Sequence, residues 1–183
     1  TAVDLAETEP ELAHIINVHA PGSLANACDE VGAVLIHYST DYVFDGTASM
    51  PYTETAAAVP TGVYGQSKLA GEIAVAKVAQ RYVILRTAWL YSAVGHNFVK
   101  TMLKLANSGK PIRVVSDQIG SPTYAQDLAL VTRSIIEELN SNRADCFGIY
   151  HVTNTGTTSW HGLAEEIFRL AAYQDVVVQP IST

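Results

Sequence analysis

The chain of 183 residues is poor in cysteine, in charged residues and in clustered positive charge. Its two cysteines, Cys28 and Cys146, lack the spacing of metal ligands, so free thiols in a reducing cytoplasm are expected. Only 16% of the residues are charged, and 11 basic against 18 acidic residues give a net charge of −7. No run of lysine or arginine is present, and this argues against nucleic acid as a partner. The six histidines are scattered, so no metal site is expected.

Long apolar runs and a glycine-rich phosphate turn are also missing. No apolar stretch approaches the roughly 20 residues that a membrane-spanning helix needs, so no membrane association is expected. Apolar residues nevertheless make up 48% of the chain, which is typical of a globular protein with one well-filled domain or one domain and a small lobe. No Gly-x-Gly-x-x-Gly pattern opens the chain, so we expect a nucleotide-binding turn to precede Thr1 in a longer protein.

The spacing of apolar residues predicts alternating helices and strands. Helices are predicted over residues 9–30, 63–80, 97–107, 124–139 and 158–172, with a kink or break at Pro21 and Thr158 or Ser159 as the cap of the last helix. Strands are predicted over residues 34–38, 82–86, 112–115, 148–152 and 176–178. This alternation favours an α/β fold with a parallel sheet that is covered on both faces. Residues 40–58 are expected to form a long, functional loop.

The most informative pattern is Tyr64 followed by Lys68 on a predicted helix. Four residues are about one turn, so the two side chains share a face with roughly 5–6 Å between their Cβ atoms. A cation about 4 Å from the phenol, at an effective dielectric constant of about 20, would stabilise the phenolate by about 4 kcal/mol, or roughly three pKa units. We therefore expect the pKa of Tyr64 to fall toward neutrality, where general acid–base catalysis is efficient. On its own the pattern is more often an ordinary surface tyrosine and lysine.

Hydroxyl groups stand where a strand is predicted to end. Ser39 and Thr40 follow one apolar run, and residues 87–89 follow the next one along the chain. Ligands of open parallel sheets bind beyond the carboxyl ends of the strands. A hydroxyl of Ser39 or Thr40 could therefore hold a substrate oxygen that Tyr64 protonates, an arrangement suited to proton delivery to a carbonyl.

The pattern Tyr64-x-x-x-Lys68 with an upstream Ser39-Thr40 resembles the extended short-chain dehydrogenase/reductase superfamily. Within it, the chain resembles the dTDP-4-dehydrorhamnose reductase family over essentially its whole length. The strings that carry the likeness are Thr1–Glu7, Ser39–Gly46, Arg86–Tyr91, Asn97–Met102 and Asp117–Thr123.

The resemblance implies a partial Rossmann-like, doubly wound parallel sheet with a small C-terminal substrate-binding lobe. Residues 1–115 would form the rear part of the dinucleotide-binding domain with the catalytic residues, and residues 116–183 would contribute to the lobe and the sheet edge. The implied reaction is NADPH- or NADH-dependent reduction of the C4 ketone of dTDP-4-dehydro-6-deoxy-L-mannose to dTDP-L-rhamnose. Family members extend beyond both ends of this chain, so a fragment is expected. A cytoplasmic location and a homodimer are further expectations.

The resemblance also implies the roles of the catalytic residues. Tyr64 would donate the proton to the developing alkoxide, and Thr40 would hydrogen-bond the same oxygen. Lys68 would lower the pKa of Tyr64 and, together with it, hold the nicotinamide ribose. Thr1 would lie at the end of the loop along which the cofactor binds.

Three further residues are implied to meet the substrate. Asp41 and Tyr42 would approach it, and Trp89 would lie against the sugar. Alternatives stay open for some of these positions: Trp89 could belong to the core, and Asp41 could bond loop amides. Asn17 could position a water for Lys68 or bond locally.

Two other interpretations compete with the reductase. One is another extended short-chain enzyme of sugar nucleotides, an epimerase or a dehydratase, although a dehydratase needs an acidic pair where this chain has Thr40-Asp41-Tyr42. The other is a non-catalytic regulatory subunit resembling the β-subunit of methionine adenosyltransferase. The joint presence of Thr40, Tyr64, Lys68 and Trp89 favours chemistry.

Overall fold

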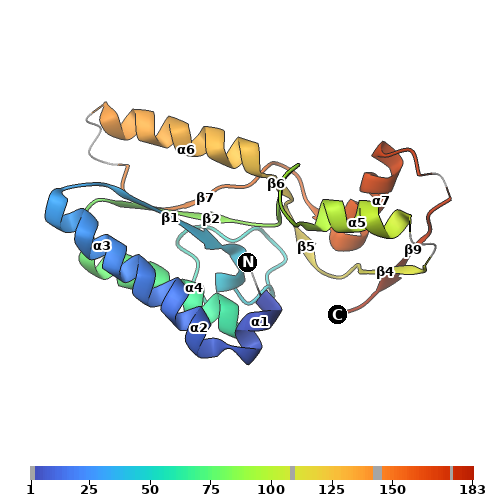
Figure 1. Cartoon of the computed structure of the whole chain (residues 1–183), viewed down its shortest axis with the longest axis horizontal. Coiled ribbons are helices and arrows are strands. Elements are labelled where there is room, and N and C mark those ends of the chain that lie inside the picture. Colours follow the sequence, from blue (N-terminus) through green and yellow to red (C-terminus); the bar gives the residue numbers. More distant parts are fainter. Residues whose placement is uncertain (1–2, 108–109, 142–145, 174) are drawn as a thin grey trace. The chain divides into compact units, whose positions relative to one another are not determined.

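The computed structural model describes residues 3–107, 110–141, 146–173 and 175–183. The chain divides into two compact units (Figure 1). The first unit comprises residues 1–87 and 135–152, and the second comprises residues 88–134 and 153–183. Helix α6 (Ala125–Asn140) contains one of the points of division. Among the helices of the described ranges, none is long and apolar enough to cross a membrane.

The first unit is built on a parallel sheet of three strands in the order β1-β2-β7. These strands are β1 (Leu35–Thr40), β2 (Tyr82–Thr87) and β7 (Gly148–His151). Successive side chains of a strand point to opposite faces, and Val83, Ile84 and Leu85 of the central strand are all fully buried. The sheet is therefore covered on both faces at β2, as its continuous apolar run predicted. Thr40 pairs with Thr87, so these two strand ends lie side by side.

Helices α3 (Ala20–Val31) and α4 (Val63–Val78) cover one face of this sheet (Figure 1). Two short helices, α1 (Val3–Thr8) and α2 (Pro10–His14), precede them, and the π-helical turn η1 (Ile15–His19) joins α2 to α3. The irregularity expected at Pro21 thus lies in the turn just before it. A proline has no N–H to donate to the preceding turn, so the regular hydrogen-bond pattern cannot run through this point.

Two glycines let helix α4 approach its neighbours closely. A Cβ added at Gly71 would clash with the backbone oxygen of Asn17 in η1, and one at Gly65 would clash with the backbone oxygen of Tyr42. Tyr42 belongs to the short 3-10 helix η2 (Asp41–Val43), which begins the predicted loop after β1. Both glycines are buried and lie on the helix that carries Tyr64 and Lys68.

Within the described residues, the second unit holds three two-stranded sheets, two whole helices and the first part of α6. Strands β4 (Ile112–Val115) and β9 (Val178–Ile181) are parallel and share a core with α5 (Phe98–Ala106) and α7 (Trp160–Leu170). The remaining pairs are β3 (Leu90–Tyr91) with β6 (Thr123–Tyr124), parallel, and β5 (Ile119–Gly120) with β8 (Thr158–Ser159), antiparallel. Ser159 caps α7, since its hydroxyl accepts the N–H of Gly162 at 2.9 Å.

We predict that Gly71→Ala destabilises the protein by about 1–3 kcal/mol, because the new methyl group must displace the backbone of η1. Gly22→Ala is the matched control: its Cβ would meet the Cβ of Ala74 at 3.6 Å, an ordinary contact. The control should gain up to about 1 kcal/mol from helix propensity. Urea unfolding of the two variants measures both effects, and a Gly71→Ala protein as stable as the parent would contradict the close approach of α4 and η1.

Candidate active site

The structure brings Thr40 and Tyr64 together in the first unit. Thr40 is the last residue of β1 and only 5% exposed, and Tyr64 is the second residue of α4. The Thr40 side chain lies close enough to the Tyr64 phenol to lower the pKa of that phenol. The Thr40 hydroxyl also accepts the N–H of Tyr42 at 3.2 Å and donates to the Oδ1 atom of Asp41 at 3.1 Å. Two hydroxyl groups therefore lie near each other at the carboxyl end of β1, the strand that pairs with the central strand β2.

The pKa of Tyr64 does not fall toward neutrality, and this part of the expectation is wrong for the arrangement observed. Burial raises the pKa of Tyr64 above its ordinary value, the nearby Thr40 side chain lowers it, and the Asp41 carboxylate raises it further. The ring of Tyr42 packs edge-on against that of Tyr64, with 5.6 Å between centroids. Burial also raises the pKa of Asp41, while its bond from Thr40 has the opposite effect. At neutral pH Tyr64 is thus a protonated phenol.

The position of the Lys68 ammonium group explains why the predicted fall in the pKa of Tyr64 is not found. Its Nζ atom donates to the backbone oxygen of Tyr38 at 2.7 Å and lies 3.5 Å from the Nε2 atom of His37. The ammonium group is therefore directed at β1 and not at the phenol one turn away. Burial lowers the pKa of Lys68, and the nearby Glu72 carboxylate raises it.

His37 is a member of the site that the sequence did not single out. The pKa of His37 is lowered to about 4, mainly by burial; the charge of Lys68 also lowers it, and the charge of Glu72 raises it. The imidazole is therefore neutral at pH 7, and its Nε2 atom can accept a hydrogen bond from Lys68. No motif pointed to this residue, because only the packing of α4 on β1 brings it to Lys68.

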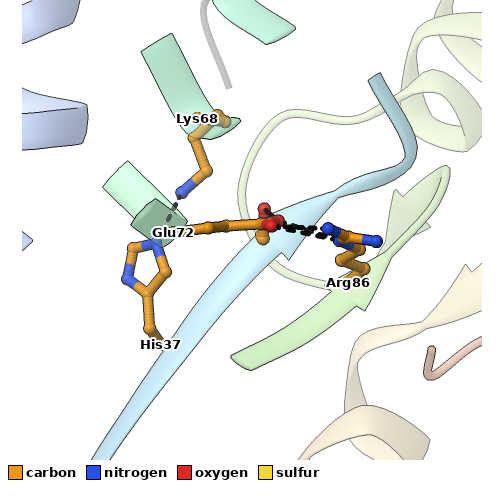
Figure 2. Close-up of polar contacts among 5 residues, drawn as sticks. His37, Lys68, Glu72 and Arg86 are labelled. Atoms are coloured by element: carbon orange, nitrogen blue, oxygen red, sulfur yellow. Dashed lines mark hydrogen bonds and ion pairs between the residues drawn. The ribbon is translucent and has the colours of Figure 1, made fainter. Parts of the chain in front are cut away.

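A buried ion pair lies on the other side of Lys68 (Figure 2). Glu72 follows Lys68 by one helical turn and is 2% exposed, and Arg86 of β2 is 5% exposed. The guanidinium group makes a two-pronged contact with the carboxylate, at 2.6 Å from Nη2 to Oε2 and 3.0 Å from Nε to Oε1. The hydroxyl of Ser39 donates to the same carboxylate. Of the two candidate hydroxyls at the end of β1, Ser39 therefore donates to Glu72, and Thr40 donates to Asp41 and lies near Tyr64.

A mainly apolar pocket of about 250 Å³ lies beside Tyr64. Helices α1 and α2 and the turn η1 contribute most of its lining, including Leu5, Leu12 and Ile16. Asn17 also lines it, and its side-chain amide donates to the hydroxyl of Ser67 on α4 at 3.0 Å. Within the ranges that the structure describes, no group of three or more histidine, cysteine or acidic side chains is placed to hold a metal ion.

The sequence model of the RmlD substrate binding domain matches residues 1–183. The chain belongs to this family. The dTDP-4-dehydrorhamnose reductase of Escherichia coli (strain K12) is 47% identical over 171 residues, which are 93% of this chain and 57% of that protein. Two crystal structures of proteins with the same name, from Bacillus anthracis and Clostridium acetobutylicum, superpose with TM-scores of 0.92 and 0.93 at 44% and 45% identity. Each superposition covers all of this chain, together with 63% of the Bacillus anthracis chain and 62% of the Clostridium acetobutylicum chain.

Membership of the RmlD family confirms the α/β, Rossmann-like fold with a parallel sheet that the sequence predicted. The Bacillus anthracis structure is a complex with NADP. The chain spans 57% to 63% of the length of these relatives, so what the whole proteins do is taken up below as a proposal.

The remaining residues expected in the site are distributed unevenly. Asp41 and Tyr42 lie beside Thr40 and Tyr64 in the first unit. Trp89 belongs to the second unit, where its ring stacks on that of Trp160 with 3.6 Å between centroids and an angle of 11°. Its backbone has a φ of 47°, unusual for a bulky residue. Thr1, expected at the cofactor, lies outside the described residues.

We predict that His37 titrates near pH 4 in the folded protein and near pH 6.5 in urea, measured by NMR of its ring protons. The folded state then binds fewer protons than the unfolded state between these values. The contribution of His37 to stability is therefore complete above pH 6.5 and is lost as the pH falls toward 4. His37→Gln should reduce this loss of stability on the acid side. A folded-state midpoint at or above 6.5 would contradict the buried, neutral imidazole.

Proposed function

We propose that this chain is the catalytic part of an NADPH- or NADH-dependent dTDP-4-dehydrorhamnose reductase. The reaction is reduction of the C4 ketone of dTDP-4-dehydro-6-deoxy-L-mannose to dTDP-L-rhamnose. The observation that carries the proposal is that the Thr40 hydroxyl and the Tyr64 phenol lie near each other at the carboxyl end of β1, with Lys68 one turn further on α4. The names of the relatives and the NADP of the Bacillus anthracis structure support it. We also propose that the reaction takes place in the cytoplasm.

The protonated state of Tyr64 suits this reaction. A reduced nicotinamide, when bound, supplies the hydride that turns the C4 carbonyl into an alkoxide. The Tyr64 phenol donates its proton to that oxygen, and the Thr40 hydroxyl holds the oxygen by a hydrogen bond. Because burial raises the pKa of Tyr64, the phenol keeps its proton at neutral pH until the oxygen becomes basic.

The residues around Tyr64 fit a nicotinamide cofactor. The pocket beside the phenol is lined mainly by apolar side chains, as an uncharged, flat dihydronicotinamide ring requires. We assign Lys68 and Tyr64 to the ribose, because an ammonium group and a phenol are both donors to a ribose hydroxyl. Thr1 would complete the cofactor site.

The substrate side of the site is assigned to Thr40, Asp41, Tyr42 and Trp89. Asp41 and Tyr42 stand directly after Thr40, and Tyr42 is 44% exposed, so it is available to a ligand. The second unit would serve as the substrate-binding lobe, with Trp89 placed against the apolar face of the deoxy sugar. Gly120 leaves the room that the Trp89 indole occupies, since a Cβ at this position would clash with the ring.

We predict that Tyr64→Phe, in the protein that carries this chain, lowers kcat by roughly 10²–10⁴-fold and leaves cofactor affinity nearly unchanged. The substitution removes the proton donor and very little volume. Tyr150→Phe is the control, because Tyr150 is an exposed tyrosine of β7. The measurement is oxidation of NADPH that depends on the dTDP-linked keto sugar. A Tyr64→Phe protein with more than a third of the parent kcat would remove Tyr64 from the mechanism.

Trp89→Ala should raise KM for the keto sugar about tenfold or more and leave KM for the cofactor within about twofold, because a stacked aromatic face contributes about 1.5 kcal/mol. The loss of the stack on Trp160 should also lower the melting temperature. Trp89→Phe keeps an aromatic ring and should show both effects more weakly. Equal losses for sugar and cofactor, in proportion to the fall in melting temperature, would make Trp89 a core residue only.

A further inference from the structure

The Glu72–Arg86 pair connects the two segments that carry the proposed catalytic residues, strand β1 with Thr40 and helix α4 with Tyr64 and Lys68. Glu72 is on α4, the helix of Tyr64 and Lys68, and its carboxylate holds Ser39, the residue before Thr40. Arg86 is on β2, one residue before the pairing partner of Thr40. A single carboxylate thus joins the helix of the proton donor to the ends of β1 and β2.

Arg86 also reaches the segment that follows Thr40. Its guanidinium carbon lies 5.2 Å from the centre of the Phe44 ring, a cation–π contact in a buried setting. The Phe44 ring stacks on Tyr52 with 4.3 Å between centroids, and the Tyr52 hydroxyl donates to Oδ1 of Asp45 at 2.5 Å. The order of residues 44–52 therefore depends on a ring that Arg86 supports, and Asp41 and Tyr42 lie at the start of the same segment.

Stability alone is a weak reason for such a pair. Removing two charges from water is costly, and well-packed apolar residues of similar volume often stabilise a protein at least as well as a buried ion pair. Apolar residues, however, cannot fix the orientation of two side chains relative to each other as directional hydrogen bonds do. The two-pronged contact fixes both groups in one relative orientation, and the remaining carboxylate capacity holds Ser39.

The negative charge of Glu72 also acts on the ammonium group of Lys68. The groups facing this ammonium are His37 and the Tyr38 carbonyl on β1, and Glu72 on its own helix. His37 is neutral, and Arg86 is held on the far side of Glu72 (Figure 2). Glu72 is therefore the carboxylate that favours the charged form of Lys68 against the effect of burial.

We propose that Glu72 and Arg86 are positioning residues of the reductase reaction: the pair holds Tyr64, Thr40 and residues 41–52 in one geometry. This inference rests on the proposed function. Neither residue touches the reacting atoms in it. Glu72 acts through Lys68 and Ser39, and Arg86 acts through Glu72 and Phe44.

Three variants of the protein that carries this chain test the inference. Glu72→Gln should lower kcat by about 10²-fold, as small misplacements of catalytic groups do. It should also move the alkaline limb of the pH–rate profile to lower pH, because Lys68 then loses its proton more easily. Arg86→Met keeps the Glu72 charge, so it should lower kcat without moving this limb to lower pH. It should speed hydrogen exchange in residues 41–52.

The third variant separates positioning from folding. Glu72→Met combined with Arg86→Met removes both charges, so its melting temperature should return close to that of the parent, while kcat stays low. Glu166→Gln is the control for removing a carboxylate from an arginine, since Glu166 and Arg169 form an exposed pair at 2.6 Å. It should change neither kcat nor the pH profile.

Two results would overturn the inference. One is a folded double variant, or a folded single variant, that keeps kcat within about twofold of the parent with an unchanged alkaline limb. The other is unchanged hydrogen exchange of residues 41–52 in Arg86→Met, and this result counts whether or not the parent is a reductase. Failure of the proposed function has a different signature: the parent itself would oxidise no NADPH with the keto sugar.

Discussion

The close approach of helix α4 to its neighbours is the constraint on which the first unit depends. Gly65 faces the backbone of Tyr42 on one side, and Gly71 faces the backbone of Asn17 on the other; a side chain at either position would push the helix away. Tyr64 directly precedes Gly65, so this contact brings its phenol to Thr40. The proposed chemistry therefore depends on glycine at these two positions of α4.

The same packing buries the charged groups of Glu72 and Arg86, which form an ion pair with each other. Glu72 lies between the cations of Lys68 and Arg86, and the uncharged His37 completes the surroundings of Lys68 (Figure 2). Burial lowers the pKa of both Lys68 and His37, and the charge of Glu72 opposes both shifts. Burial also raises the pKa of Tyr64, so the site holds a protonated phenol beside a buried hydroxyl. This is the state from which a phenol can protonate an alkoxide.

The sequence predicted the local elements well because their signals are local. Continuous apolar runs predicted the parallel strands, with β4 found at the expected residues 112–115, and Ser159 was one of two expected caps. The last strand was expected at 176–178 and lies at Val178–Ile181, because its bounds depend on the register with β4 and not on its own pattern. Tertiary contacts account for what was missed in the site. The spacing of Tyr64 and Lys68 was right for one helical face, but Lys68 reaches the Tyr38 carbonyl, which no spacing rule can show. His37, Glu72 and Arg86 carry no motif, and they matter only where β1, β2 and α4 meet.

The central claim is that a hydride reaches C4 of a dTDP-linked keto sugar in a site built around Tyr64. Its most direct measurement is isotope transfer from NADPH that carries deuterium at C4 of the nicotinamide ring, in the hydride position that is transferred. The account predicts dTDP-L-rhamnose with deuterium at C4 of the sugar and one cofactor oxidised for each sugar reduced. Conversion of the sugar with no deuterium at C4 and no net cofactor oxidation, as an epimerase or dehydratase would give, would contradict it.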